Sequence, residues 1–274
     1  MGRATIALPT FVPHSMSSVL QRLLRRFGAR LHRRRASLAE WERHHERRVE
    51  SDVRRVLPYV PDGGVFVDVG ANIGLFTQAI LRERANCRAY LFEPVRALYE
   101  CCTERFAGDA RVVVEQLALA HEAGPATIWK ARHNPGGNSL VYDLMFDRRD
   151  VAEVTEKTIH DEERVERVVF DDYAREHGIE HVDFIKTDTE GFDYQVLRGM
   201  LGFLARCEPR PVILAELMEQ DYHPHWDEQH AVVRRLYDLG YQEVDLTKMK
   251  KIDDILFLPK SLRENVAPVR DSGA

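Results

Sequence analysis

Only four cysteines occur among the 274 residues, and no two of them form a C-x-x-C pair. Cys101 and Cys102 are adjacent within a helical pattern, so the sequence predicts neither a disulfide framework nor a zinc site. No apolar run approaches the roughly 20 residues that a membrane span needs. Pro9, Pro13 and His14 interrupt the stretch where a secretory signal would be apolar. We therefore expect no signal peptide, no transmembrane helix and a reducing, cytoplasmic location.

The main body of the chain is poor in basic residues. Residues 1–60 hold thirteen Arg and five acidic residues, a net charge of +8, so the remainder carries −13 to give −5 overall. Contact with nucleic-acid phosphates needs Lys and Arg clustered around a site. The acidic body therefore argues against a nucleic-acid substrate. The 44% apolar content of the whole chain suffices for the core of one α/β domain with extensions.

The basic excess coincides with a helical pattern over residues 18–57. Apolar side chains recur there at about 3.6-residue spacing between arginines, at Val19, Leu20, Leu23, Leu24, Phe27 and Leu31. We expect a basic helical extension over residues 1–57. Two interpretations stay open: the apolar stripe packs on the neighbouring domain, or the helix makes peripheral contact with the inner surface of an anionic membrane.

Residues 58–260 alternate short apolar runs with helical stretches, as in an α/β doubly wound parallel sheet with helices on both faces. Strands are predicted at Val65–Val69, Arg88–Phe92, Val112–Leu117, Val182–Thr187 and Pro211–Leu217, with a final antiparallel hairpin of Tyr241–Asp245 and Asp254–Leu258. Residues 118–169 break the alternation, with a predicted hairpin over Thr127–Tyr142. We interpret them as an insertion that covers the substrate. Residues 261–274 are expected to form a flexible tail.

The first predicted strand ends in a loop rich in small residues. Asp68 closes the strand, and Gly70, Asn72 and Gly74 follow, so the backbone can approach a ligand closely. A pyrophosphate-binding loop has glycine where Asn72 stands, and Asp68 would repel an anion. A cationic amino-acid cofactor fits better, because Asp68 can accept hydrogen bonds from its ammonium group while the glycines leave room.

A second acid, Glu93, ends the next predicted strand, nineteen residues after Gly74. A carboxylate there can accept hydrogen bonds from both hydroxyls of a ribose. Dinucleotide enzymes place an acid similarly, so Glu93 discriminates only together with the G-x-N-x-G loop. The pair of features favours S-adenosyl-L-methionine as cofactor. In the alternative interpretation, Asp68 and Glu93 only cap loops of the sheet.

Two more carboxylates follow a later strand, in the run DFIKTDTEG. Asp188 and Glu190 lie two positions apart, so in an extended chain both face the crevice at the strand ends. This is where open α/β sheets bind ligands. Lys186 lies on the same face. In the alternative interpretation the acids have only a structural role, and Lys186 neutralises one of them.

The segments VFVDVGANIGLFT, LFEP and DFIKTDTEG, followed by VLRG at Val196–Gly199, resemble the FkbM family of methyltransferases over roughly residues 65–258. The resemblance implies a class I methyltransferase (Rossmann-like) fold, S-adenosyl-L-methionine as donor and a hydroxyl of a sugar or polyketide natural product as acceptor. It implies cofactor binding by Asp68, Gly70, Ala71, Asn72, Gly74, Glu93, Pro94 and Ala118. Asp188 and Glu190 would line the reaction centre. Family members commonly have IKIDVEGAE where this chain has IKTDTEGFD, a difference that bears on the acceptor.

Methyl transfer to an alcohol needs a group that takes the hydroxyl proton. We expect Asp188 to be that base or to orient it, with His133 and His223 as alternates. The stretch GGNSL, which contains Asn138 and Ser139, resembles the G-N-S stretch of the family. We therefore name Asn138, Ser139 and His223 as candidate substrate contacts. A plain hairpin turn is the alternative for GGNSL.

We expect no metal ion. The alternative is an octahedral cation site formed by Asp188 and Glu190 with the ring nitrogens of His121, His133, His223 and His225. Three functions remain open. The preferred one is O-methylation of a small-molecule or glycan substrate, either a carbohydrate or a glycosylated or polyketide natural product. The others are methylation of an amine or lipid headgroup, and a non-catalytic cofactor-binding scaffold.

Overall fold

The computed structural model describes residues 42–43, 45–131, 136–142, 159–245 and 252–263. The chain divides into a unit of residues 1–44 and a compact unit of residues 45–274. Most of the predicted basic extension, including its apolar stripe, lies outside the described residues, as does the predicted tail from residue 264 onward. The account below concerns the second unit.

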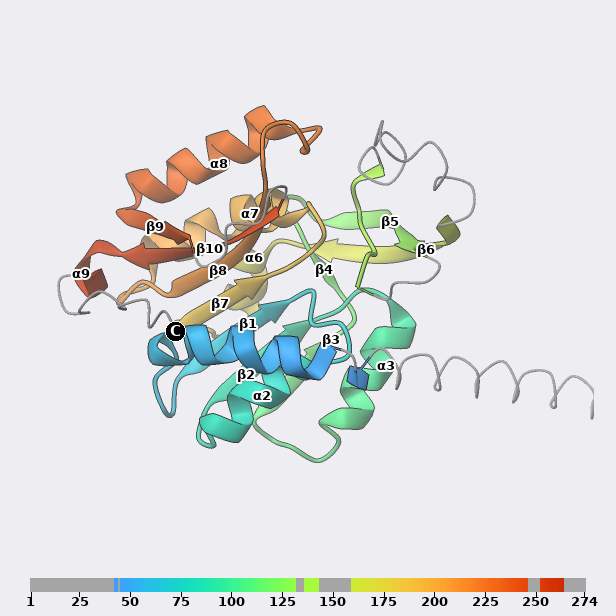
Figure 1. The fold of residues 1–274 in the computed structure, drawn as a ribbon, viewed down its shortest axis with the longest axis horizontal. Helices are drawn as coiled ribbons and strands as arrows, with labels where there is room; N and C mark the ends of the chain where they lie inside the picture. Colours follow the sequence, from blue (N-terminus) through green and yellow to red (C-terminus); the bar gives the residue numbers. More distant parts are fainter. Residues whose placement is uncertain (1–41, 44, 132–135, 143–158, 246–251, 264–274) are drawn as a thin grey trace, which may run out of the picture. The chain divides into compact units, whose positions relative to one another are not determined.

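A seven-stranded sheet forms the centre of this unit, in the order β3-β2-β1-β7-β8-β10-β9 (Figure 1). The strands are β1 (Val65–Val69), β2 (Arg88–Phe92), β3 (Val112–Glu115), β7 (Phe184–Thr187), β8 (Val212–Met218), β9 (Tyr241–Asp245) and β10 (Ile252–Pro259). The first five strands in that order pair in parallel, and β10 is antiparallel to both β8 and β9. The prediction of a class I methyltransferase sheet with an antiparallel final hairpin is confirmed.

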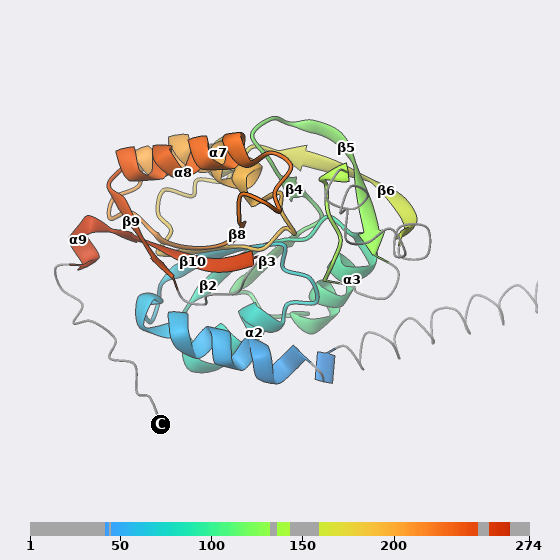
Figure 2. The ribbon, with the colours of Figure 1, turned by 45° about the horizontal axis from the view of Figure 1, so that its top comes forward.

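Helices cover both faces of the sheet (Figure 2). One face carries α2 (Leu75–Glu83), α3 (Arg96–Arg105) and a helix over residues 45–56, and the other carries α6 (Phe170–Glu176), α7 (Asp193–Arg206) and α8 (Trp226–Asp238). Phe66 and Phe184 pack on the first face, while Val67 and Ile185 pack on the second. Burial on both faces explains why these strands are nearly continuous apolar runs. No described helix is long and apolar enough to cross a membrane.

The helix over residues 45–56 belongs to the core of the domain. Val53 and Val56 are 2% and 0% exposed and lie in the same apolar cluster as Leu214 of β8 and Leu256 of β10. The short helix η1 (Leu57–Tyr59) connects this helix to β1. The structure thus begins the compact α/β unit near residue 45, whereas the sequence pattern assigned residues up to 57 to the extension.

A second, three-stranded sheet contains β4 (Ala118–Leu119), β5 (Gly124–Ala131) and β6 (Ile159–Val168), in the order β4-β6-β5. It corresponds to the predicted insertion, and of the hairpin predicted over Thr127–Tyr142 the described residues retain one antiparallel bridge. The antiparallel partner of β5 is β6, and residues 136–142 join β5 through one bridge between Trp129 and Ser139. The Pro-Gly-Gly turn signal indicates a reversal of the chain, but it does not specify which later strand completes the ladder.

Candidate active site

One cleft brings together the loops that follow β1, β2 and β7, and Ile128 of β5 in the second sheet also lines it. Its lining includes many of the predicted site residues: Gly70, Asn72, Glu93, Pro94, Ala118, Asn138, Asp188 and Glu190. The predicted residues Asp68, Ala71, Gly74, Ser139 and His223 are not among the residues that line it. The parallel sheet therefore gathers predicted cofactor and reaction-centre residues at the carboxyl ends of its strands, as expected for open α/β sheets.

Glu93 lies at the end of β2, 4% exposed, and each of its oxygens has a backbone partner. Oε2 accepts a hydrogen bond from the Asn72 N–H at 2.8 Å, and Oε1 accepts one from the Val95 N–H at 2.9 Å. Burial raises the pKa of Glu93 to about 8. Each carboxylate oxygen can accept more than one hydrogen bond, so Glu93 retains acceptor capacity for hydroxyl donors.

Asp68 lies beneath the cleft, with no exposed surface. Its Oδ2 accepts a hydrogen bond from the Thr77 hydroxyl at 2.7 Å, and its Oδ1 lies 3.3 Å from the Lys186 ammonium. A direct contact with the cofactor stays a prediction. The carboxylate has partners within the protein that hold the start of the loop.

The glycines of the first loop are required by close contacts within the protein. Gly70 has φ +72°, and a Cβ there would lie 2.0 Å from the Asp188 carbonyl oxygen. Gly74 has φ +79°, and a Cβ there would lie 2.7 Å from the Phe106 ring. Asp188 and Phe106 therefore fill the space beside these two glycines. The expectation that both glycines leave room for the cofactor is corrected, because their small size accommodates other parts of the protein.

Two non-glycine residues among those described, Asn72 and Glu190, have positive φ, at 54° and 53°. Both line the cleft. Asparagine adopts this conformation more readily than most residues, whereas glutamate does so at a cost. Such backbone strain is concentrated at functional sites. The two positions therefore mark the loops of the cleft independently of their side-chain chemistry.

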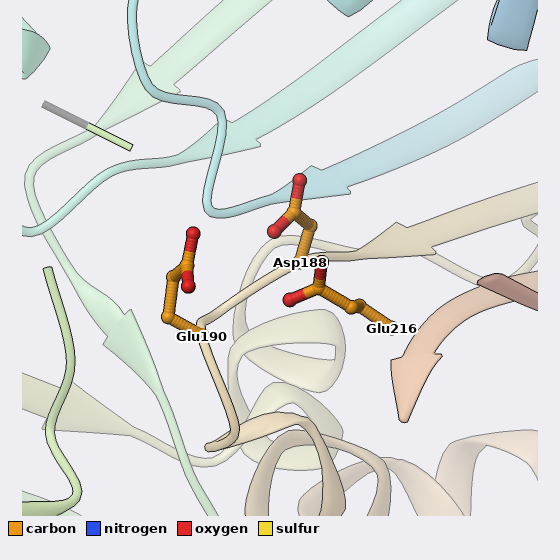
Figure 3. Close-up of side chains that lie close together, drawn as sticks. All are labelled: Asp188, Glu190 and Glu216. Carbon is orange, nitrogen blue, oxygen red and sulfur yellow. The ribbon is translucent and has the colours of Figure 1, made fainter. Parts of the chain in front are cut away.

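Three carboxylates meet at the carboxyl ends of β7 and β8 (Figure 3). Asp188, Glu190 and Glu216 each offer an oxygen, and these oxygens lie within 4.8 Å of one another. Burial, together with the charges of Asp188 and Glu190, raises the pKa of Glu216. A buried acid with a raised pKa can take up a proton. The spacing of the three carboxylates also suits a divalent cation. Glu216 was missed from the sequence, although an acid at a strand end was the signal that identified Glu93.

Asp193, at the start of α7, adds a further buried acid beside this loop. It is 1% exposed, and its Oδ2 accepts a hydrogen bond from the Thr189 N–H at 3.2 Å. Burial raises its pKa to about 6. The residue that departs from the family pattern thus anchors the loop that carries Glu190.

Ser139 and His223 hold the same loop from the other side. The Ser139 hydroxyl donates to the Glu190 carbonyl at 2.7 Å, and His223 Nε2 lies 2.9 Å from the Gly191 carbonyl. His223 Nδ1 accepts from the His225 N–H at 3.0 Å, so Nε2 carries the proton in this arrangement. Burial lowers the pKa of His223. The two side chains position backbone carbonyls, and their contact with substrate stays a prediction.

The histidines proposed for a cation site do not assemble around the carboxylates in the described part of the chain. His133 lies outside the described residues. His223 is engaged with Gly191, and the ring of His225 stacks on Tyr194 at 6.1 Å. The structure instead brings Glu216 to Asp188 and Glu190, and it places Lys186 Nζ 3.3 Å from Asp188 Oδ2.

Comparisons with known proteins agree with this geometry. The model of the methyltransferase FkbM domain matches residues 68–243. Methyltransferase sdnD of Sordaria araneosa is 28% identical over 163 residues, which cover 52% of this chain and 62% of that protein. Methyltransferase 1 of Beauveria bassiana is 25% identical over 155 residues, covering 53% of this chain and 61% of that protein. The matched region thus spans about three fifths of each relative.

Among solved structures, an S-adenosylmethionine-dependent methyltransferase from Aquifex aeolicus is similar at 14% identity, with a TM-score of 0.40, over 76% of this chain and 88% of that one. The family model covers well over half of the chain and includes the loops after β1, β2 and β7 that meet in the cleft. The chain therefore belongs to the FkbM family of S-adenosyl-L-methionine-dependent methyltransferases.

Proposed function

We propose that this protein transfers a methyl group from S-adenosyl-L-methionine to a hydroxyl oxygen of a carbohydrate or of a glycosylated or polyketide natural product. The observation that carries the proposal is that one cleft is lined by Glu93 and Asn72 at one part and by Asp188 and Glu190 at another. In this proposal Glu93 and Asn72 bind the methyl donor, and Asp188 and Glu190 lie next to the reacting methyl group and help to remove the proton of the acceptor. Bound there, S-adenosyl-L-methionine supplies an electrophilic methyl group on a cationic sulfonium.

The chemistry of the cleft fits this cofactor. Glu93 is a buried acceptor suited to ribose hydroxyls, and the apolar side chains of Leu98, Leu117 and Ile128 line the same cleft, as an adenine ring requires. The acids Asp188 and Glu190 provide negative charge that complements a sulfonium. Asp68 would contribute by holding the loop, through Thr77 and Lys186.

The acidic cluster is suited to take the proton that an alcohol must lose. A base placed within hydrogen-bonding reach of the hydroxyl contributes roughly 10²- to 10⁴-fold to the rate. Lys186 lies 3.3 Å from Asp188 Oδ2 and engages that oxygen in an ion pair. We infer that Asp188 orients the hydroxyl and that the proton passes to the cluster formed with Glu190 and Glu216.

Transfer of a labelled methyl group into a cell extract tests the proposal. We expect a labelled product whose methyl group survives as an ether after hydrolysis of the carbohydrate. A labelled amine would assign the protein to the second kind of acceptor. A protein that binds the cofactor but labels nothing in extracts from several growth conditions would be the scaffold.

Substitutions in the cluster locate the reaction end of the cleft. Asp188→Asn should abolish turnover and leave the affinity for S-adenosyl-L-methionine within a few-fold of the wild type. Asp109→Asn is the matched control, because it also removes one charge of an ion pair, the one with Arg111, away from the cleft. Turnover retained by Asp188→Asn would contradict the role of this residue. Turnover lost in chelator and restored by magnesium would assign the three carboxylates to a cation instead.

A further inference from the structure

Lys186 lies where the two loops of the cleft come together, although it does not line the cleft itself. It sits on β7 directly opposite Asp68 of the neighbouring strand β1. The residue is 8% exposed. Its side chain is therefore buried between the strand that leads to the cofactor loop and the strand that leads to the acidic loop.

Three oxygens from these two segments surround the Lys186 ammonium. Nζ donates a hydrogen bond to the Gly70 carbonyl at 3.2 Å, and it lies 3.3 Å from Asp68 Oδ1 and 3.3 Å from Asp188 Oδ2. The Phe76 ring closes the site, with its centroid 5.7 Å from Nζ. The Gly70 carbonyl is held by a hydrogen bond, and the two carboxylates are held by ion pairing with the same ammonium.

The backbones of the two loops are also in close contact near this ammonium. The Asp188 N–H donates to the Val69 carbonyl at 3.1 Å, and a Cβ at Gly70 would lie 2.0 Å from the Asp188 carbonyl. A shift of either loop would therefore be transmitted to the other. Interiors this tightly packed move between discrete arrangements and do not deform gradually.

Electrostatics favour the charged form of the lysine in this place. Burial opposes the charge, but the Asp188 and Asp68 carboxylates outweigh burial and raise the pKa of Lys186. Asp68, which has no exposed surface, has no other described cation within ion-pair distance. Without the ammonium, Asp68 would be a buried charge without compensation, which proteins tolerate poorly.

We infer that Lys186 is a positioning residue that couples the cofactor loop to the acidic loop, so that donor affinity depends on a side chain outside the cleft. The inference rests on the proposed function, because it takes the loop at Gly70 as the donor site. In this role Lys186 does more than neutralise a neighbouring acid. The ammonium sets the Gly70 carbonyl and the Asp188 carboxylate relative to each other.

The first test is Lys186→Met, which keeps the length and apolar stem of the side chain and removes its three donors. We expect affinity for S-adenosyl-L-methionine, measured by titration calorimetry, to fall about tenfold or more, since small displacements of a site carry costs of this size. Lys130→Met is the matched control, because Lys130 is also part of an ion pair, 2.9 Å from Glu163, and does not line the cleft. The control should bind within twofold of the wild type.

A double variant separates positioning from charge compensation. In Asp68→Asn with Lys186→Met, no buried carboxylate is left unpaired at Asp68, so the melting temperature should return close to that of Asp68→Asn alone. We expect the affinity for S-adenosyl-L-methionine to stay about tenfold weaker than that of Asp68→Asn, because the Gly70 carbonyl still lacks its donor. Affinity equal to that of Asp68→Asn would overturn the inference. Should Lys186→Met fail to fold, the double variant still gives the answer.

The double variant also separates the two quantities that simple destabilisation would change together, because its melting temperature should recover while its donor affinity should not. Absence of binding by the wild-type protein would instead reject the proposed function, so the two failures are distinguishable.

Discussion

The Glu93 carboxylate accepts the Asn72 N–H at 2.8 Å, and this hydrogen bond ties the end of β2 to the loop that follows β1. The second oxygen accepts the Val95 N–H, which holds the start of α3. One buried side chain thus organises the two loops that would hold the ribose. Because burial raises its pKa to about 8, we expect Glu93 to carry a proton at neutral pH in the free protein.

Binding of S-adenosyl-L-methionine should release a proton from Glu93. Ribose hydroxyls donate hydrogen bonds and so favour the ionised carboxylate, which lowers its pKa in the complex. Titration calorimetry near pH 7 in buffers of different ionisation enthalpy should give different apparent binding enthalpies. Glu93→Gln should bind more weakly and show no such difference. Equal enthalpies in all buffers for the wild type would place the ribose elsewhere.

The same group predicts how the stability of the free protein depends on pH. The pKa of Glu93 is about 8 in the folded protein and near 4.5 when the side chain is exposed, so the folded state binds the extra proton between these values. The free energy of unfolding should therefore decline as the pH rises from about 4.5 to about 8. Glu93→Gln should reduce this slope but not remove it, because Glu216 and Asp193 also have raised pKa values. Urea denaturation at several pH values measures it, and stability that increases across this range would contradict the assignment.

His223 should prove dispensable as a base. Its two ring nitrogens already face the Gly191 carbonyl and the His225 N–H, and burial lowers its pKa. His223→Gln can still donate to the Gly191 carbonyl, so turnover in the labelled-methyl assay should fall by less than the 10² expected for loss of a base. His177→Gln is the control, because His177 is an exposed histidine directly after α6 whose Nδ1 lies 2.9 Å from the Tyr173 carbonyl oxygen. A loss as deep as that of Asp188→Asn would restore His223 to the list of bases.

The central sheet could be predicted from the sequence because the pattern is local and repeated. The predicted bounds of β1 and β2 agree with the structure, as the apolar runs end at Asp68-Val69 and at Phe92. Acids placed just after such runs, Glu93 and Asp188, also lie in the cleft, since the ends of parallel strands share one edge. The sheet and these residues of the cleft thus follow from strand periodicity and from where each strand ends.

Other features depend on contacts between distant segments, which periodicity cannot supply. The pairing of β5 with β6 joins strands nearly thirty residues apart, and a turn signal at residues 134–137 indicated a nearer partner. Glu216 became part of the site only because β8 lies beside β7. Gly70 was correctly expected in the cleft, but the reason for its lack of a side chain is the Asp188 carbonyl, a contact across 118 positions.

Truncation should place the domain boundary near residue 45. Removal of residues 1–44 should leave cooperative unfolding and donor affinity unchanged, because the core begins with the helix over residues 45–56. Removal of residues 1–57 also deletes the buried Val53 and Val56, and each buried valine contributes about 1.5 to 3 kcal/mol. The longer deletion should therefore be largely unfolded by circular dichroism. A folded, donor-binding protein without residues 1–57 would contradict this boundary.

The shorter truncation also tests the proposed membrane contact of the arginine-rich residues. If these residues hold the protein at an anionic surface, the full chain should sediment with anionic vesicles at low salt, and the protein without residues 1–44 should stay in the supernatant. Neutral vesicles are the control. Identical behaviour of the two proteins would discard the contact.

A matched pair of glycine substitutions should separate backbone conformation from the contact between the two loops. Gly70 and Gly108 have φ of +72° and +80°, so alanine is strained at both, by about 1 to 2 kcal/mol. At Gly108 nothing lies within 4 Å of the added Cβ, whereas at Gly70 it would lie 2.0 Å from the Asp188 carbonyl. Gly70→Ala must displace that backbone, so it should lose more than about 4 kcal/mol or fold with donor affinity abolished, while Gly108→Ala should bind normally. Denaturant unfolding and calorimetry measure both, and equal effects of the two substitutions would mean that the close approach of Gly70 to Asp188 does not constrain the site.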